Sequence, residues 1–468
     1  MKKIDSKNII ENLEKENKIL KSKVSKLESK IILKDNEMEH LKYFYYIENE
    51  KINFERFVRL NIHYIRNNGI LKYISSVFKS LFRVFGLAFK KVWYKFFPRP
   101  ELVQLRKILK EHKGKKIIVF YPGYEWYMKM YQRPQHIAVQ MAKKDILYFY
   151  CTQNFTDNIN GFKKIQENLY VTNQLWFLKK YLPKYTLQLY ANMNGCWLPE
   201  LKEIQENGND ILYEYIDDLH EDLTVIPKEL LERHKYALSD ESIKVAATSN
   251  HLYKKALKYR KKNIILSTNG VVYEDFHINK KPDIPKKIKD IVNQKKPIIG
   301  YYGALASWFD YDLIKKLANE RKDLNILLIG IDYDGTLEQS DILSLKNVYY
   351  IGTVDYKELV NYGYYCNVLT IPFVINEITL ATSPVKIFEY MSMEKPIVTT
   401  DLPECRKYKS VFISKNHENF IKNIDKALNS QNDEKYKTLL KREALQNTWS
   451  KKVDEILELL NTQNEDGE

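Results

Sequence analysis

Residues 297–330 of the 468-residue chain read PIIGYYGALASWFDYDLIKKLANERKDLNILLIG, and this stretch decides the predicted fold class. Its apolar runs at 297–303 and 325–330 predict two buried strands, and the pattern of residues 311–320 predicts a helix between them. Continuous apolar strands separated by a helix are typical of parallel sheets that are covered on both faces. The stretch therefore predicts one strand–helix–strand unit of a parallel sheet.

The same alternation continues from this unit in both directions along the chain. Downstream, we expect helices at 355–362 and 384–392 and strands at 348–352, 367–373 and 396–400. Upstream, we expect a helix at 133–143 and strands at 115–122, 146–151, 211–217, 245–249 and 263–270. The polar, lysine-rich residues 276–296 contain two prolines and interrupt the pattern, as a linker does. The sequence thus predicts an α/β protein with two doubly wound Rossmann-like domains, at 111–275 and 297–445.

The composition is that of a globular protein, with 44% hydrophobic and 29% charged residues. No run of 18 uncharged apolar residues occurs, and the first residues lack the apolar core of a signal peptide, so we expect neither a spanning helix nor a leader. The cysteines are too few and too scattered for a disulfide scaffold or a zinc site: Cys151, Cys196, Cys366 and Cys405. These features predict a reduced, cytosolic protein.

The positive charge is concentrated at the N-terminus. Residues 1–100 hold 22 Lys and Arg against 11 Asp and Glu, a net charge of +11 out of +15 for the whole chain. An enzyme that acts on nucleic acid usually spreads a basic groove over its core, so we expect no nucleic-acid partner. The distribution predicts instead that the N-terminal part meets an anionic surface.

Residues 8–42, within a segment at 1–50, carry a heptad pattern with one exception, Lys34. Such a pattern is typical of a parallel two-stranded coiled coil, in which Asn17 would set the register, and it predicts a homodimer. A single solvated helix with chance periodicity is the alternative. The two phases of the pattern hold Ile10, Asn17, Val24, Ile31 and Met38, and then Leu13, Leu20, Leu27 and Leu41.

A second N-terminal segment, at 51–110, has a core at 69–99 that reads GILKYISSVFKSLFRVFGLAFKKVWYKFFPR. Apolar and aromatic residues recur at helical spacing in this core, basic residues lie between them, and no acidic residue occurs. A basic amphipathic helix of this kind is typical of helices that lie in the interface of an anionic membrane. The alternative is a helix that packs on the protein body with its basic face in solvent.

Two groups of residues in the second predicted domain can hold a phosphate-bearing ligand. Gly303 and Ala304 follow a predicted strand, where small residues let backbone N–H groups approach a phosphate, although many tight turns use glycine for its φ alone. Lys386 and Glu389 lie three residues apart on one face of a predicted helix, so a lysine can meet a pyrophosphate while a carboxylate accepts hydrogen bonds from sugar hydroxyls. An ordinary surface ion pair is the alternative. The residues that open this helix are Ser383 and Pro384.

Polar residues also follow strands of the first predicted domain. Trp126, Arg133 and His136 come after its first strand, and Asp217 and Asp218 end another strand. Ligands of open α/β sheets bind at the carboxyl ends of strands, so Arg133 could clamp an anion and an aspartate could act as a base toward a sugar hydroxyl. The alternatives are a packed Trp beside a salt bridge, and a turn or N-cap pair of aspartates.

Several well-known catalytic motifs are absent from the sequence. The chain has no HExxH, GxSxG, Walker lysine loop, CxxC pair or GxGxxG. The sequence therefore gives no support for metal hydrolases, serine esterases, P-loop enzymes or dinucleotide oxidoreductases. We expect no metal ion and no cofactor.

Six segments, in their order and spacing over about residues 115–460, resemble the family-4-like glycosyltransferases of the GT-B fold, of the bacterial surface-polysaccharide type (teichuronic acid or capsule). The segments lie at 126–138 (WYMKMYQRPQHIA), 213–218 (YEYIDD), 247–276 (ATSNHLY…ILSTNGVVYEDF), 299–314 (IGYYGALASWFDYDLI), 347–373 (NVYYIGTVDYKELVNYGYYCNVLTIPF) and 383–404 (SPVKIFEYMSMEKPIVTTDLPE). Both N-terminal segments lie outside this resemblance.

The resemblance implies that a nucleoside diphosphate sugar, in particular a UDP-sugar, binds mainly to the second domain. Gly303 and Lys386 would then face the diphosphate, Glu389 the ribose, and Ile351 with Gly352 the base. The other implied donor-side residues are Ala304, Ser383 and Pro384. One position departs from the family, because Ala381 stands where members often have a Glu that contacts the donor sugar; whether transfer retains or inverts the anomeric centre stays open.

On the acceptor side, the resemblance implies roles for residues of the first domain. Gly123, Trp126, Arg133 and His136 would face the acceptor, and Asp217 and Asp218, with Lys386, would be the catalytic residues. The acceptor would be a glycan or a lipid-linked sugar. Residues 446–468 would form a helix that crosses back to the first domain.

Together these features predict a bacterial glycosyltransferase in cell-surface glycan synthesis, peripheral on the inner face of the cytoplasmic membrane. Two alternatives remain. One is a catalytically silent GT-B scaffold whose coiled coil recruits partners at the membrane. The other is a sugar-nucleotide epimerase of the same fold, which would act without an acceptor.

Overall fold

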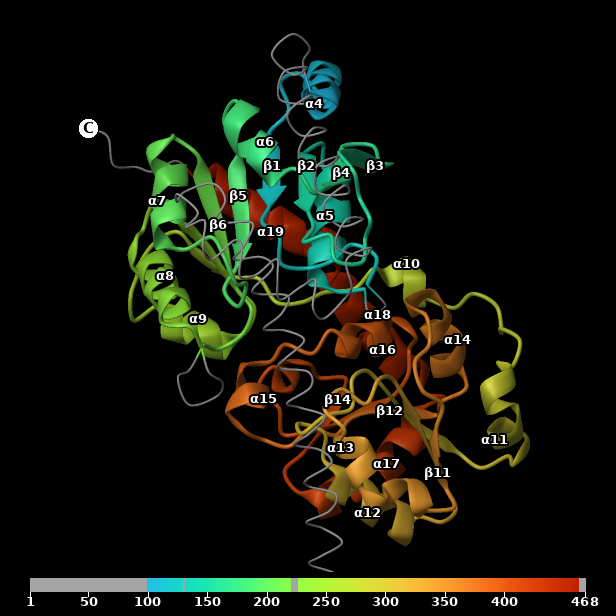
Figure 1. The fold of residues 1–468 in the computed structure, drawn as a ribbon. Coiled ribbons are helices and arrows are strands. Elements are labelled where there is room, and N and C mark those ends of the chain that lie inside the picture. Colours follow the sequence, from blue (N-terminus) through green and yellow to red (C-terminus); the bar gives the residue numbers. More distant parts are fainter. Residues whose placement is uncertain (1–98, 129–130, 220–225, 463–468) are drawn as a thin grey trace, which may run out of the picture. The chain divides into compact units, whose positions relative to one another are not determined.

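The computed structural model describes residues 99–128, 131–219 and 226–462, which belong to one compact unit. Figure 1 shows its helices and strands. Buried side chains in this unit form two hydrophobic cores, each built around one sheet. The expected coiled coil at 1–50 and nearly all of the basic segment at 51–110 lie outside the described residues.

The first sheet has eight strands in the order β3-β4-β2-β1-β5-β6-β7-β8. Its neighbouring strands pair in parallel, except that β3 pairs antiparallel with β4 at the edge. Edge strand β3 exposes Lys163 and Lys164, which protects an unpaired edge from other strands. The strands are β1 (Ile117–Phe120), β2 (Leu147–Cys151), β3 (Phe162–Gln166), β4 (Leu169–Thr172), β5 (Thr186–Tyr190), β6 (Asp210–Tyr215), β7 (Lys244–Ala247) and β8 (Ile264–Leu266).

Helix α5 follows β1 and covers the residues predicted from the sequence. It begins at Arg133 because Gln132 and Gln135 form a capping box, and it ends at Lys143, shortly before Asp145 with its φ of +66°. Helix α4 belongs to the first core through Leu105 and Ile108, although the sequence assigned it to the basic segment. The helices of this half are α4 (Pro100–Glu111), α5 (Arg133–Lys143), α6 (Leu175–Tyr181), α7 (Leu198–Glu206), α8 (Lys228–Ser239) and α9 (Asn250–Ala256).

The second sheet has six parallel strands in the order β11-β10-β9-β12-β13-β14. The strands are β9 (Ile298–Tyr302), β10 (Asn325–Ile329), β11 (Val348–Tyr350), β12 (Val368–Ile371), β13 (Ile397–Thr400) and β14 (Val411–Ser414). The α-helices are α10 (Tyr273–Phe276), α11 (Lys289–Asn293), α12 (Tyr311–Glu320), α13 (Thr336–Gln339), α14 (Leu359–Tyr364), α15 (Glu377–Ala381), α16 (Lys386–Ser392), α17 (His417–Ser430) and α18 (Glu434–Gln446). The 3₁₀ turns are η1 (Lys286–Ile288), η2 (Asp341–Ser344), η3 (Tyr356–Glu358) and η4 (Cys405–Lys407). The expected linker at 276–296 thus includes α11.

The chain passes between the two sheets twice, and the two passages touch. Val271 pairs with Thr448: the N–H of Val271 donates to Asn447 O at 3.1 Å, and the N–H of Trp449 donates to Val271 O at 3.0 Å. A Cβ on Gly270 would lie 2.9 Å from both Asn447 O and Trp449 N, so this close approach requires glycine.

The last helix, α19 (Trp449–Asn461), packs on the first sheet, against α5, β7 and β8 (Figure 1). Its buried residues Trp449, Val453, Ile456 and Leu459 belong to the first core.

The predicted α/β class with parallel sheets is confirmed. All four cysteines lie in the described part of the chain and are buried, free thiols. Every helix within the described ranges is too short or too polar to span a bilayer.

Candidate active site

The main pocket of the described unit has a volume of about 960 Å³ and takes its walls from both sheets. Loops after the carboxyl ends of β6, β9, β10 and β12 meet there, as expected for ligand sites of open α/β sheets. Eight of the residues singled out from the sequence line it: Arg133, Asp217, Gly303, Ala304, Ser383, Pro384, Lys386 and Glu389.

Gly303 lies at the end of β9, where the chain comes very close to Lys386. It has a φ of +140°, and a Cβ there would lie 2.8 Å from Lys386 Cε. Gly330, at the end of β10, packs on Gly303 in turn, because its own Cβ would overlap the Gly303 carbonyl. The N–H of Gly303 donates to Ile329 O at 2.9 Å, and the Tyr301 hydroxyl donates to Ala304 O at 2.7 Å. Neither position has room for a side chain, so two glycines shape this wall of the pocket.

Lys386 and Glu389 occupy one face of α16 and line the pocket together. The Lys386 ammonium lies 5.4 Å from the Tyr301 ring centre and 5.0 Å from that of Phe373. Burial lowers the pKa of Lys386 to about 8, an effect that the Glu389 carboxylate opposes. Burial also raises the pKa of Glu389 to about 7. Both charges are poorly solvated, so a ligand that pairs with them gains more than it would at a surface.

Two tyrosines that the sequence analysis did not identify stand beside Glu389. Burial, with the Glu389 carboxylate, raises the pKa values of both Tyr302 and Tyr356. The Tyr302 hydroxyl is buried and makes no well-directed hydrogen bond within the described part of the chain. Tyr356 lies at η3 and touches the first half of the chain, with ring centres 5.5 Å from Tyr131 and 5.6 Å from His136. Tyr302 lies near the end of one predicted strand and Tyr356 follows another, and only this placement could have indicated them.

The loop that carries Ser383 and Pro384 is tied to the first half of the chain. Asn269, which follows β8, donates from Nδ2 to Ser383 O at 2.6 Å, and its backbone N–H lies 3.3 Å from Ser383 Oγ. Asn269 also lines the pocket. The sequence shows Asn269 next to Gly270, but it gives no sign of the contact with Ser383.

Arg133 is held in a buried ion pair rather than left free to clamp an anion. Its Nε donates to Glu214 Oε2 at 2.7 Å, and NH2 lies 2.7 Å from the same oxygen. Arg133 is 5% exposed and Glu214 is fully buried. Glu214 lies within β6, where a buried strand gave no sign of a functional carboxylate. The ion pair neutralises the positive charge of Arg133, which we expected to face an acceptor.

The other residues expected to face an acceptor lie behind the pocket wall. His136 stacks on Trp449, with ring centres 5.0 Å apart and planes 13° from parallel, and burial lowers its pKa to about 3. Trp126 is buried against Tyr150. Gly123 packs on Met193, whose Cγ would lie 2.5 Å from an added Cβ.

The two neighbouring aspartates point in different directions, and only Asp217 lines this pocket. Asp217 lines the pocket and accepts from Asn192 Nδ2 at 2.6 Å; although its side chain reaches solvent, the surrounding protein raises its pKa. Asp218 turns away, pairs with Lys255 and accepts from the Tyr215 hydroxyl at 3.0 Å. The interactions with Lys255 and Tyr215 hold the pKa of Asp218 below its usual range, against the effect of its burial. Only Asp217 is placed to meet a ligand in the pocket.

Ile351 and Gly352 lie just behind another part of the pocket wall. The Ile351 carbonyl accepts from Lys287 Nζ at 3.1 Å, and Lys287 itself lines the pocket. The Gly352 carbonyl accepts from the N–H of Gly330 at 2.9 Å. These two residues therefore shape the wall through their backbone.

No cluster of three or more His, Cys, Asp or Glu side chains suited to a metal ion occurs among the residues that the structure describes.

The fold, the pocket and a family match together indicate the class of protein. Residues 296–430 match the family described as glycosyl transferases group 1. The match covers the segment with Gly303, Lys386 and Glu389. Two parallel α/β sheets with a pocket between their carboxyl ends form the GT-B architecture, and the resemblance predicted from the sequence is confirmed.

Among individual proteins, the chain is similar to the putative teichuronic acid biosynthesis glycosyltransferase TuaH of Bacillus subtilis strain 168. The two are 28% identical over 217 residues, which is 44% of this chain and 53% of that protein. The chain thus spans about half the length of this curated relative.

Solved structures share the fold at low sequence identity. One is HepE of Anabaena in complex with UDP-glucose, with a TM-score of 0.55, 13% identity, and coverage of 74% of this chain and 100% of HepE. Another is WaaG, a glycosyltransferase involved in lipopolysaccharide biosynthesis, with a TM-score of 0.53, 12% identity, and coverage of 74% and 100%.

Proposed function

We propose that the protein is a glycosyltransferase that moves a sugar from a nucleoside diphosphate sugar to an acceptor in cell-surface glycan synthesis. One observation carries this proposal: Lys386 and Glu389 share one poorly solvated face of α16 in a pocket lined by both sheets, with Gly303 against the lysine. The matched domain and the teichuronic acid relative support the same reaction class.

The donor would lie along the carboxyl ends of β9 and β12. The Lys386 ammonium would pair with the diphosphate and stabilise the negative charge that grows as this group leaves. Glu389 would accept hydrogen bonds from the ribose hydroxyls, and the absence of a side chain at Gly303 would let the diphosphate approach the backbone. The UDP-glucose complex of HepE supports a nucleotide-sugar donor, and we propose UDP as the nucleotide.

The acceptor would enter from the first sheet, beside Asp217. The raised pKa of Asp217 lies closer to neutral pH than that of an ordinary aspartate, and a general base with such a pKa accepts a proton more readily while it stays ionised. The Asn192 amide holds one carboxylate oxygen at 2.6 Å and leaves the other for an incoming hydroxyl. We propose Asp217, and not Asp218, as the group that meets the acceptor hydroxyl.

Turnover tests the proposed reaction. The purified protein is incubated with a panel of UDP-, GDP- and ADP-sugars, with and without a lipid-linked sugar acceptor, and release of the nucleoside diphosphate is measured. We expect acceptor-dependent release that Lys386→Ala or Glu389→Ala reduces by about a hundredfold or more. Lys346→Ala, an exposed lysine outside the pocket, is the matched control.

The outcomes separate the candidate functions. Unchanged turnover in both variants would contradict the donor site. Conversion of the sugar nucleotide without an acceptor would favour an epimerase, and the absence of nucleotide binding by calorimetry would favour a silent scaffold.

We further propose that residues 1–98 attach the enzyme to the inner face of a bacterial cytoplasmic membrane and pair two copies through the coiled coil. The support is the basic, amphipathic sequence at 69–99 and the heptad pattern at 8–42. Deletion of residues 1–98 keeps α4, which packs in the first core, and should release the protein from vesicles containing anionic lipid. Continued vesicle binding, or an unchanged number of chains per particle in solution after the deletion, would contradict the respective proposal.

A further inference from the structure

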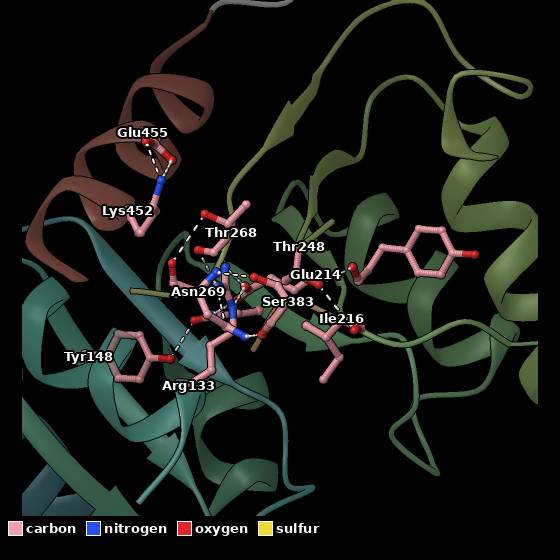
Figure 2. Close-up of polar contacts among 12 residues, drawn as sticks. Arg133, Tyr148, Glu214, Ile216, Thr248, Thr268, Asn269, Ser383, Lys452 and Glu455 are labelled. Carbon is pink, nitrogen blue, oxygen red and sulfur yellow. Dashed lines mark hydrogen bonds and ion pairs between the residues drawn. The ribbon is translucent and has the colours of Figure 1, made fainter. Parts of the chain in front are cut away.

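A continuous chain of buried polar groups runs from the centre of the first sheet to the loop before α16 (Figure 2). It begins in β2, where the Tyr148 hydroxyl donates to Gln188 Oε1 at 2.5 Å. Gln188, in β5, then donates from Nε2 to Glu214 of β6. Gln188 and Glu214 are fully buried, so their side chains form hydrogen bonds with protein groups and not with water.

Arg133, at the start of α5, is the next member of this series of polar groups. Its guanidinium binds Glu214 with one edge, as described above, and NH1 donates to Thr268 O at 3.1 Å and to Asn269 Oδ1 at 3.2 Å. The guanidinium also lies 5.6 Å from the Trp449 ring centre. Figure 2 shows Arg133 with Glu214, Thr268 and Asn269 around it. A planar cation held at several points has little freedom to move, so it presents its NH1 donor in a fixed place.

The two ends of the Asn269 amide have different partners. Oδ1 accepts from the Arg133 guanidinium, and Nδ2 donates to Ser383 O at 2.6 Å. The opposite orientation would place NH2 against a guanidinium and the amide oxygen against a carbonyl, so the network allows one orientation alone. The Arg133–Glu214 pair therefore decides which way the amide of Asn269 points.

The final partner lies next to the proposed donor site. Ser383 precedes Lys386 by three residues, and Pro384 stiffens the connection between them. A restraint on the Ser383 carbonyl is thus a restraint on where α16 begins, and on where the Lys386 ammonium lies relative to Gly303.

We propose that Asn269 is a positioning residue for the donor site, and that the buried Arg133–Glu214 pair sets donor affinity through it. This inference rests on the proposed function. It predicts that Glu214, which is fully buried and outside the pocket lining, influences nucleotide binding to the other sheet.

Titration calorimetry of the full chain with UDP tests the role of Asn269. Asn269→Asp keeps the acceptor toward Arg133 but turns an oxygen toward Ser383 O, and we expect a dissociation constant raised about fivefold or more. Asn269→Ser, too short to reach Ser383 O and uncharged, should weaken UDP to a similar extent. Thr268→Val keeps the carbonyl that accepts from Arg133 and loses only the 3.3 Å contact from its hydroxyl to Asn269 O, so it should leave UDP affinity unchanged.

A double-mutant cycle separates positioning from a direct contact between Asn269 and the nucleotide. Glu214→Gln should weaken UDP about twofold or more in the unaltered chain and should have no further effect in the Asn269→Asp background. Thermal unfolding of each ligand-free variant reports any change in stability, which a merely structural role would lower without this pattern in UDP affinity.

Equal UDP affinity of Asn269→Asp, Asn269→Ser and the unaltered chain would overturn the inference and leave the proposed function intact. An additive cycle would overturn the role of the Arg133–Glu214 pair. Absence of binding by the unaltered chain to UDP, GDP and ADP would overturn the proposed function and the inference together.

Discussion

A Cβ on Gly330 would lie 1.8 Å from the carbonyl oxygen of Gly303, closer than any two unbonded heavy atoms can approach. Gly330 also has a φ of +146°, which L side chains rarely adopt. We therefore expect Gly330→Ala to force the ends of β9 and β10 apart, to lower the free energy of unfolding by about 2 kcal/mol or more, and to weaken UDP binding.

Urea denaturation and calorimetry measure these two effects. The matched control is Gly114→Ala, because Gly114 has a φ of +87° but no atom within 4 Å of its added Cβ. The control should lose about 1 kcal/mol of stability from backbone strain and keep its affinity for UDP. Equal losses in both variants would show that the close contact between the two glycines has no energetic consequence.

Glu389→Gln should change how stability depends on pH. Burial raises the pKa of Glu389 to about 7 from an ordinary value near 4.5, so between these values the folded chain binds a proton that the unfolded chain does not. The stability that this group contributes is full below about pH 4.5 and is lost as the pH rises through 7. Relative to Glu389→Gln, the unaltered protein should lose about 1.4 kcal/mol per pH unit across this window. Urea unfolding of both proteins at pH 4.5, 5.5, 6.5 and 7.5 would detect the difference, and parallel curves would contradict it.

His136→Phe should protect the protein from acid. The folded pKa of His136 is lowered to about 3 by burial, against an ordinary value of 6.5, so the unfolded chain binds the extra proton between these values. The stability that neutral His136 contributes is full above pH 6.5 and is lost as the pH falls toward 3. Phenylalanine can keep the stack on Trp449 without titrating. We expect an acid-unfolding midpoint at lower pH, followed by far-UV circular dichroism; an unchanged midpoint would argue against a buried neutral imidazole.

Trp449→Ala should be among the most destabilising substitutions in the chain. The Trp449 side chain is fully buried, stacks on His136 and lies against the Arg133 guanidinium. Its removal leaves a large cavity where α19 meets the first sheet and should cost about 3–5 kcal/mol. Trp176→Ala is the control, since Trp176 is 55% exposed and should cost less than about 1 kcal/mol. Thermal or urea unfolding compares the two variants; similar losses would contradict the role of α19 as a packed part of the first core.

Local pattern was sufficient to predict much of the fold. Helices α5 and α12 begin and end at the expected residues, and β1, β2, β9, β10, β12 and β13 lie in the expected runs, because each has strong periodicity or a continuous apolar stretch. Strands β3, β4, β5 and β14 were not predicted. In β3 the alternation is weak and two lysines are exposed, so pairing with β4, and not the sequence of β3 itself, makes it a strand.

The candidate site divides along the same line. Lys386 and Glu389 could be placed together from their spacing within one helix. The partners of Arg133 could not, because Glu214 and Asn269 lie 81 and 136 residues away along the chain, and the strand pattern around Glu214 gives no sign of its role. Likewise, His136 is buried by Trp449, a residue from the opposite end of the described chain.

The contact between Val271 and Thr448 bears on any attempt to produce the protein in two pieces. A fragment that stops after β8 would leave β7 and β8 without the helix that covers them, and their bare apolar flank would favour aggregation. A split protein would have to receive residues 448–462 back, either fused to the first fragment or added as a peptide. The first half of the fold is therefore complete only after α19, the last helix along the chain, has packed on it.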